Sequence, residues 1–369
     1  MKYAIMLIPR SKPRWEVREA YALAETAGYS IVETLRYRRL TRSKVLSSAK
    51  LDELAKLASR YSKYSPTIIL FDDMKPREYF RIVKKTRREV IDRTLLLLEI
   101  FALHAGSKEA KLQIELARLH HQLPIVREAI RQAKLRELPG FLGPGTYAID
   151  AYYRHMVSRI SRIKKQLEAL RRRRAIERSK RSSRGIPHVS IVGYASAGKT
   201  SLFNKLTGFS KPVGGEYFTT ISPKVGSAVS NGLKIAFIDT VGFITRIPPE
   251  IIEAFHSTLE EVAYSDIIIY VLDLSEPEDV MLEKLNEGIS TLRRIGVIGK
   301  PLVIAANKID LVRDQSEVKR LSTVIESVAS ELYPAFKAIV PISATEGSGV
   351  GELLWITTKL LKSTVKYTS

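Results

Sequence analysis

Eight residues in the second half of the chain have the types and spacing needed to hold a phosphate group. They follow the pattern G-x-x-x-x-G-K-T and are Gly193, Tyr194, Ala195, Ser196, Ala197, Gly198, Lys199 and Thr200. In such a loop the glycines let backbone N–H groups turn toward phosphate oxygens, the lysine adds positive charge, and the threonine hydroxyl can bind Mg²⁺. An apolar run before the loop predicts a buried strand, and a helical pattern begins at Ser201. We therefore expect residues 193–201 to bind the phosphates of a nucleotide.

A second motif supplies a candidate metal ligand. Residues 239–242 follow another apolar run in the pattern D-x-x-G. In nucleoside triphosphatases with this order of motifs, Asp239 would hold Mg²⁺ through water and the N–H of Gly242 would face the γ-phosphate. Thr200 and Asp239 therefore predict a magnesium site. A further ligand is expected from a threonine between these motifs, and Thr219 and Thr220 are equivalent candidates on the sequence alone.

A third motif selects the base. Asn307, Lys308 and Asp310 form N-K-x-D after an apolar run. A carboxylate at Asp310 accepts both N1–H and N2–H of guanine, which adenine does not offer, while Asn307 and Lys308 would brace the surrounding loops. The guanine carbonyl would then meet the backbone of a segment after the next strand, Ser343, Ala344 and Thr345. Three motifs in this order, each after an apolar strand, indicate a GTP/GDP-binding domain that hydrolyses GTP.

The residue that orients the attacking water is not identifiable. Ras-type enzymes carry Gln directly after the D-x-x-G glycine, whereas this chain has Phe243. A phenyl ring does not hydrogen-bond water, so the catalytic group is unknown. We predict slow intrinsic hydrolysis that is stimulated when a partner or the N-terminal region supplies or orders a catalytic group.

The elements that must position these motifs form three predicted domains. Residues 1–106 alternate strand and helix patterns, which predicts a small, mostly parallel α/β domain. Residues 107–182 contain two helical patterns with one apolar seam each, which predict a long antiparallel coiled-coil hairpin with a Gly/Pro tip at 138–146. Residues 183–369 return to alternating strands and helices. The expected fold class is therefore α/β, with a P-loop GTPase domain (a mixed sheet flanked by helices) after the small domain and the hairpin.

Two local signals refine this picture. Asn231 and Gly232 stand between two strand patterns and predict a β-hairpin turn. Pro124 stands inside the first long helical pattern, where a proline is expected to kink or divide the helix.

The charge of the chain argues for a polyanionic partner. The sequence has 60 Lys and Arg against 39 Asp and Glu, a formal net charge of +21. Between residues 162 and 184 it has eleven basic residues and two glutamates. Phosphate contact is the simplest use of this density. The candidate RNA-binding residues are Arg171, Arg172, Arg173, Arg174, Lys180 and Arg181.

Composition excludes several classes of protein. The chain has no cysteine, which excludes a disulfide scaffold and a cysteine nucleophile. Its apolar runs are far shorter than the ~20 residues that span a bilayer, and the N-terminus lacks a signal-peptide pattern. We expect a cytoplasmic protein without a membrane span, and a monomer.

With these motifs in place, the sequence resembles the HflX-type GTPases, a translation-factor-related class. The resemblance also rests on Val90–Thr94 with 100–102, on Lys111–Leu116, and on the segment after Gly242, which contains Phe243, Ile244, Ile247, Pro248 and residues 253–261. Ser196 stands where the family commonly has Asn, and Gly143–Gly145 remain of a tip that is usually longer.

The resemblance implies more than the motifs do. It selects Thr220 over Thr219 as the switch threonine that binds Mg²⁺ and the γ-phosphate. It implies a GTPase that binds the large ribosomal subunit, with the hairpin reaching rRNA near the peptidyl transferase centre. In bacterial members it also implies splitting of stalled or idle ribosomes.

Two other functions remain open on the sequence. One is an RNA-binding, chaperone-like protein in which guanine nucleotide is only a stability ligand. The other is a membrane-surface GTPase that uses its basic helix on anionic lipids. The helix near Arg171 lacks the broad apolar face with aromatic anchors that interfacial helices have, which argues against binding to a membrane surface.

Overall fold

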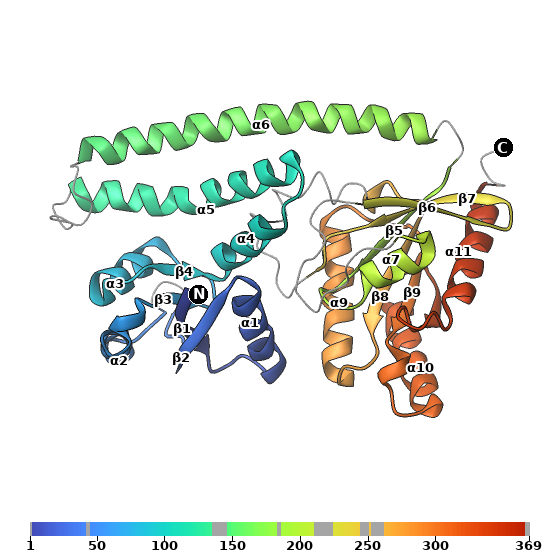
Figure 1. Cartoon of the computed structure of the whole chain (residues 1–369), viewed down its shortest axis with the longest axis horizontal. Coiled ribbons are helices and arrows are strands. Elements are labelled where there is room, and N and C mark those ends of the chain that lie inside the picture. The colour runs from blue at the N-terminus through green and yellow to red at the C-terminus, as the bar shows by residue number, and fades with distance from the viewer. Residues whose placement is uncertain are drawn as a thin grey trace. The chain divides into compact units, whose positions relative to one another are not determined.

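The chain forms two compact units, which we describe separately (Figure 1). The computed structural model describes residues 2–41, 45–134, 146–182, 186–209, 224–243, 251 and 262–365. The first unit extends to Ala169 and the second begins at Leu170, within one long helix. Thr219, Thr220 and positions 138–145 of the predicted hairpin tip lie outside the described residues.

The first unit begins with a parallel four-stranded sheet in the order β2-β1-β3-β4. Its core contains apolar residues of all four strands and of α2 and α3. Contacts pair α2 with α3 and α1 with α4. The elements are β1 (Lys2–Pro9), α1 (Arg14–Thr26), β2 (Tyr29–Tyr37), α2 (Ser48–Arg60), β3 (Thr67–Leu70), α3 (Pro76–Thr86), β4 (Val90–Asp92) and α4 (Arg93–His104). A small parallel α/β domain was the expectation here, and the fold class is confirmed.

Two long helices follow, α5 (Lys108–Lys134) and α6 (Thr146–Ser182). Within the first unit they run antiparallel, because Glu115 meets Arg159 while Arg127 meets Tyr153 (Figure 1). Pro124 was expected to kink or divide the first helix. It does not divide it, since α5 continues through that position. A proline removes one backbone hydrogen bond, and the contacts with α6 hold α5 on both sides of that position.

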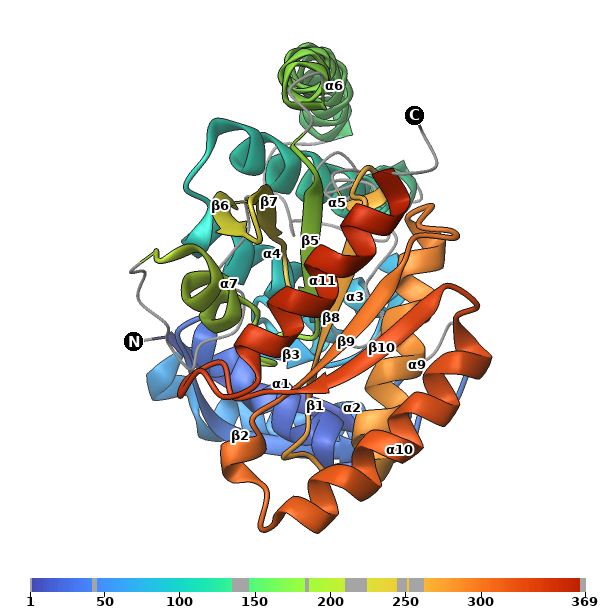
Figure 2. The same cartoon turned by 90° about the vertical axis from the view of Figure 1, so that its right-hand side faces the viewer.

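The second unit is built on a mixed six-stranded sheet in the order β10-β9-β8-β5-β7-β6 (Figure 2). Among the described strands of this sheet, β6 alone is antiparallel; it is joined to β7 through Asn231 and Gly232, which both have the positive φ of a tight hairpin turn. The elements are β5 (His188–Gly193), α7 (Lys199–Thr207), β6 (Lys224–Ser230), β7 (Leu233–Asp239), β8 (Ile267–Asp273), α9 (Glu278–Arg294), β9 (Leu302–Asn307), α10 (Gln315–Leu332), β10 (Phe336–Pro341) and α11 (Val350–Val365).

Helices cover both faces of this sheet. Contacts pair α7 with α11 and α9 with α10. A core of buried residues joins the strands to α7 and α11. The central strands β5, β8 and β9 are almost wholly buried, as their continuous apolar runs predict. The carboxyl ends of β5, β7, β8 and β9 therefore deliver Gly193, Asp239, Asp273 and Asn307 to one edge of the sheet.

No described helix meets the length and apolarity needed to cross a membrane.

Candidate nucleotide-binding site

The loop between β5 and α7 has the geometry of a phosphate cradle. Gly198 directly precedes α7 and has a φ of 96°, which side-chain-bearing residues rarely adopt. A Cβ at this position would collide with the side-chain amide of Asn307. The loop therefore closes against the end of β9, with the N-terminus of α7 beneath it, where backbone N–H groups attract anions.

Lys199 carries a buried charge in this loop. Its side chain is 7% exposed, and its ammonium group donates a hydrogen bond to the carbonyl oxygen of Tyr194 at 2.5 Å. Burial lowers the pKa of Lys199 to about 8, although the carboxylate of Asp239 acts in the opposite direction. The charged form of a buried ammonium group is stabilised by a nearby anion. A bound phosphate group therefore suits this position.

The two described metal-ligand candidates meet each other. Asp239 ends β7 and is fully buried, and the hydroxyl of Thr200 donates to its carboxylate at 3.1 Å. A hydroxyl and a carboxylate are oxygen ligands of the kind that Mg²⁺ prefers. The donor set therefore fits Mg²⁺ bound beside a phosphate group. Thr220, the third candidate, lies outside the described residues.

Asn307 connects the phosphate loop to the loop expected at the base. Its side-chain amide donates to the carbonyl oxygen of Ala197 at 2.7 Å, and its amide oxygen accepts the N–H of Ala344 at 2.9 Å. Ser343 and Ala344 are buried, whereas Thr345 is exposed. One buried side chain thus sets the distance between two loops that are 147 positions apart in the chain, 197 and 344.

The remaining residues of the base motif follow Asn307. Lys308 has a left-handed φ of 69°, and its ammonium group pairs with Asp273 at the end of β8 at 2.5 Å. Asp310 is exposed in a short 3-10 helix, Ile309–Leu311. Its carboxylate is thus accessible to a base. Sequence reasoning missed Asp273, which stands directly at the end of a buried strand and was detectable from that position.

Three family models together match most of the chain. "GTP-binding GTPase N-terminal" matches residues 15–102, "GTP-binding GTPase Middle Region" matches 104–181, and "50S ribosome-binding GTPase" matches 188–308. The protein named GTPase HflX of Hyperthermus butylicus is 65% identical over 364 residues, which cover 98% of this chain and 97% of that protein. The chain belongs to the HflX family of GTPases. It binds guanine nucleotide and hydrolyses GTP, as its family and its GTPase domain indicate.

A second relative and a solved structure agree with this assignment. GTPase HflX of Saccharolobus solfataricus is 41% identical over 339 residues, covering 91% of this chain and 93% of that protein. The crystal structure of a GTP-binding protein from Sulfolobus solfataricus in complex with GDP is 34% identical, with a TM-score of 0.53. The match covers 99% of this chain and all of that one. The HflX family membership and the P-loop GTPase fold expected from the sequence are therefore confirmed.

The candidate RNA-binding residues lie on α6. Arg171, Arg172 and Arg173 are exposed on consecutive positions of this helix. Consecutive residues of a helix point about 100° apart, so the three side chains cover much of its circumference. Arg174, Lys180 and Arg181 belong to the same helix, but their side chains lie outside what the structure describes.

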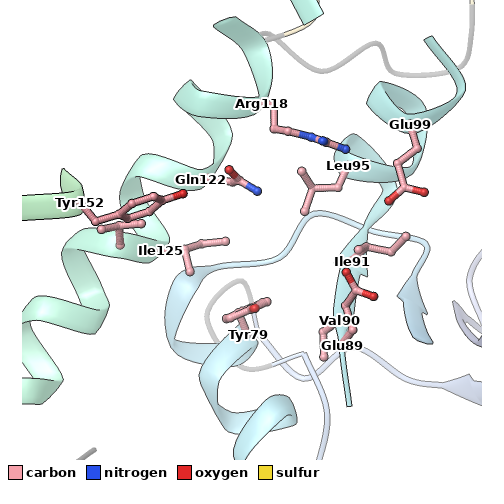
Figure 3. Close-up of a pocket in the computed structure, with 11 residues that line it drawn as sticks. Tyr79, Glu89, Val90, Ile91, Leu95, Glu99, Arg118, Gln122, Ile125 and Tyr152 are labelled. Carbon is pink, nitrogen blue, oxygen red and sulfur yellow. The ribbon is translucent and has the colours of Figure 1, made fainter. Parts of the chain in front are cut away.

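The first unit has a pocket of about 340 Å³ that none of the predicted site residues lines (Figure 3). Val90, Ile91 and Leu95 form a buried floor, and α5 contributes Arg118 and Gln122 on the facing side. The floor belongs to the Val90–Thr94 segment and its continuation in α4. Helix α5 therefore meets the edge of the sheet along a seam that leaves this pocket open.

Proposed function

We propose that this GTPase is a nucleotide-switched factor that binds rRNA of the large ribosomal subunit when GTP is bound. Mg²⁺ and GTP are held by residues 193–201 with Asp239, Gly242 and Thr220. Asn307, Lys308, Asp310 and residues 343–345 hold the guanine. The match to a ribosome-binding GTPase model carries the proposal. The exposed arginines of α6 support it, because phosphate contacts supply most of the affinity for RNA.

The buried constellation of Lys199, Thr200 and Asp239 supports the assignment of the phosphate and metal site. Mg²⁺ supplies charge neutralisation between the β- and γ-phosphates when it is bound. Lys199 adds a positive charge at the same end of the nucleotide. Thr200 and Asp239 hold the metal, and Asp310 fixes the base by accepting its N–H groups.

The proposal includes slow hydrolysis in the free protein. Phe243 is 1% exposed, and its phenyl ring provides no hydrogen bond for a water molecule. The water-orienting group must then come from elsewhere, and ribosome binding supplies or orders it. Single-turnover hydrolysis should accelerate when large subunits are added. Fast hydrolysis that ribosomes leave unchanged would contradict this part.

Sedimentation with large ribosomal subunits tests the central claim. The protein is layered on sucrose gradients with GDP or a non-hydrolysable GTP analogue, at two salt concentrations. Comigration that requires the GTP analogue and survives moderate salt is the expected result. Comigration that ignores the nucleotide and disappears with salt would instead indicate a general RNA-binding helix. The same gradient with whole ribosomes tests subunit splitting, which the proposal includes as a GTP-dependent activity.

A matched pair of variants tests the role of α6. Replacing Arg171, Arg172 and Arg173 by Ala should weaken binding and reduce its salt dependence, because fewer counterions are released. Replacing Arg313, Lys319 and Lys337 by Ala removes the same charge from other exposed positions. If both triple variants lose binding equally, overall charge rather than α6 is responsible. We further propose that the protein is cytoplasmic and monomeric. Light scattering after size exclusion measures the oligomeric state.

A further inference from the structure

The residue after the D-x-x-G glycine is bonded to the phosphate loop. The N–H of Phe243 donates to the carbonyl oxygen of Gly193 at 2.9 Å, and its own carbonyl oxygen accepts the N–H of Ala195 at 2.7 Å. Tyr194 and Phe243 therefore form an isolated parallel bridge beyond the ends of β5 and β7. This bridge joins the loop that holds the phosphates to the segment that must sense the γ-phosphate.

The bridge fixes the position of Gly242. A Cβ built on Gly242 would lie 3.0 Å from both the Cα of Ala195 and the ammonium nitrogen of Lys199. The backbone of Gly242 is thus held directly against the end of the loop where Lys199 stands. A γ-phosphate interacts with the lysine of such a loop, so the N–H of Gly242 is within the region that this phosphate occupies.

Both residues of the bridge are connected to the same turn of α9, Tyr194 directly and Phe243 through Tyr270 of β8. The hydroxyl of Tyr194 donates to the carboxylate of Glu287 at 2.6 Å. The ring of Phe243 lies 6.5 Å from the ring of Tyr270, measured between centroids, and the hydroxyl of Tyr270 donates to the carbonyl oxygen of Lys284 at 2.9 Å. Residues 284–287 of α9 thus anchor the aromatic side chains on both sides of the bridge.

Burial strengthens these contacts. Tyr194 is 5% exposed, and Phe243 and Tyr270 are less exposed still. A hydrogen bond from a phenol to a carboxylate is charge-assisted and is stronger away from water. Burial also raises the pKa of Tyr270, with Glu287 and Glu276 adding to the effect, so that its hydroxyl stays protonated and remains a donor.

We propose that Tyr194 and Glu287 are positioning residues for GTP, which act through the bridge to hold the N–H of Gly242 ready for the γ-phosphate. The inference rests on the proposed phosphate site at residues 193–201. GDP lacks the γ-phosphate, so the Tyr194–Glu287 hydrogen bond stabilises bound GTP more than bound GDP. Phe243 stands where Ras-type enzymes carry Gln. It thereby contributes to the preference for GTP over GDP, because its backbone forms the bridge and its ring anchors the bridge.

The test compares affinities for GDP and for a non-hydrolysable GTP analogue in the full-length protein with Mg²⁺. Glu287→Ala and Tyr194→Phe should each weaken binding of the GTP analogue about five- to tenfold, less than the full loss of a hydrogen bond to a charged group would give, because this bond acts on the γ-phosphate only through the bridge. GDP affinity should change less than about twofold. Glu287→Gln should keep the ratio of the native protein, because its amide oxygen still accepts the phenol. Glu283→Ala, an exposed position one turn away on α9, is the matched control and should also keep that ratio.

Three results would overturn the inference. In the first, Glu287→Ala and Tyr194→Phe both keep the native ratio. In the second, both nucleotides weaken equally, which indicates general loosening of the loop. In the third, Glu287→Gln loses as much as Glu287→Ala. Should Glu287→Ala fail to fold, Tyr194→Phe and Glu287→Gln decide the matter. Lys199→Ala separates the two levels: undiminished binding of both nucleotides in this variant would refute the phosphate site itself.

Discussion

Asn307 links two loops of the proposed nucleotide site. It is 2% exposed, and its amide bonds Ala197 on one side and Ala344 on the other. Asn307→Ala removes both hydrogen bonds and leaves two buried backbone groups unsatisfied, which should cost about 2–4 kcal/mol in the free energy of unfolding. Affinity for GTP and GDP should fall together, because both loops move. Urea denaturation and nucleotide titration measure the two effects.

Asp310→Asn is the matched control for this prediction. Asp310 is exposed and should contribute to base recognition rather than to the loop framework. The amide presents a donor where guanine requires an acceptor, so the preference should shift from guanine toward xanthine nucleotides at nearly native stability. A variant of Asn307 that changed base preference without losing stability would contradict the distinction drawn between these residues.

At the scale of elements, one carboxylate joins β4, α4 and α5. Asp92 ends β4, accepts the N–H of Leu95 as the N-cap of α4, and contacts the ring nitrogen of His121 in α5 at 2.8 Å. Asp92→Ala should lower the stability of the first unit by about 2–3 kcal/mol, from loss of the cap and of a buried hydrogen bond. Calorimetry checks this. Asp73→Ala removes an exposed carboxylate of the same unit and should lower its stability much less. Equal losses of stability in the two variants would show that the cap is not responsible.

The two long helices are joined by a pair whose effect depends on pH. Arg159 donates two hydrogen bonds of 2.6 Å to Glu115 and holds the pKa of that carboxyl below its usual value. Because the folded-state pKa is lowered, the contribution to stability is fully present above the unfolded pKa of Glu115, about 4.5, and is lost as the pH falls from there through the lower folded-state pKa. Native protein and Arg159→Ala should therefore differ in urea midpoint at pH 7, and this difference should shrink as the pH falls below about 4.5. A difference that persists unchanged at pH 3 would exclude this pair as its source.

The sequence predicts those features that depend on residues close together in the chain. Residue types at fixed short spacings identify the hairpin turn at Asn231 and Gly232 and the glycines of the phosphate loop. Pro124 does not divide the first helix, because contacts of α5 with α6 hold the helix on both sides of that position. The Tyr194–Glu287 contact joins residues 93 positions apart, and no local pattern marks either as a partner. Long-range side-chain pairs of this kind come only from the packing of elements around the sheet.

The two units have separate cores, and the described residues of the proposed nucleotide site belong to the second unit. Apolar residues of the first sheet pack against α2 and α3, and those of the second sheet pack against α7 and α11. Lys199, Thr200, Asp239 and Asn307 all belong to the second unit. A ligand stabilises the cooperative unit that binds it, by about 2.7 kcal/mol when its concentration is 100 times the Kd.

We therefore expect two transitions in calorimetry of the full-length protein, of which GDP with Mg²⁺ raises only one. For a unit of this size the expected rise in Tm is about 5–10 °C at 100 times the Kd. Lys199→Ala should abolish the shift and leave the other transition in place, because that transition belongs to the core of the first unit. Equal displacement of both transitions by GDP would mean that the units unfold as one. The nucleotide would then control the stability of the small α/β domain as well as that of the GTPase domain.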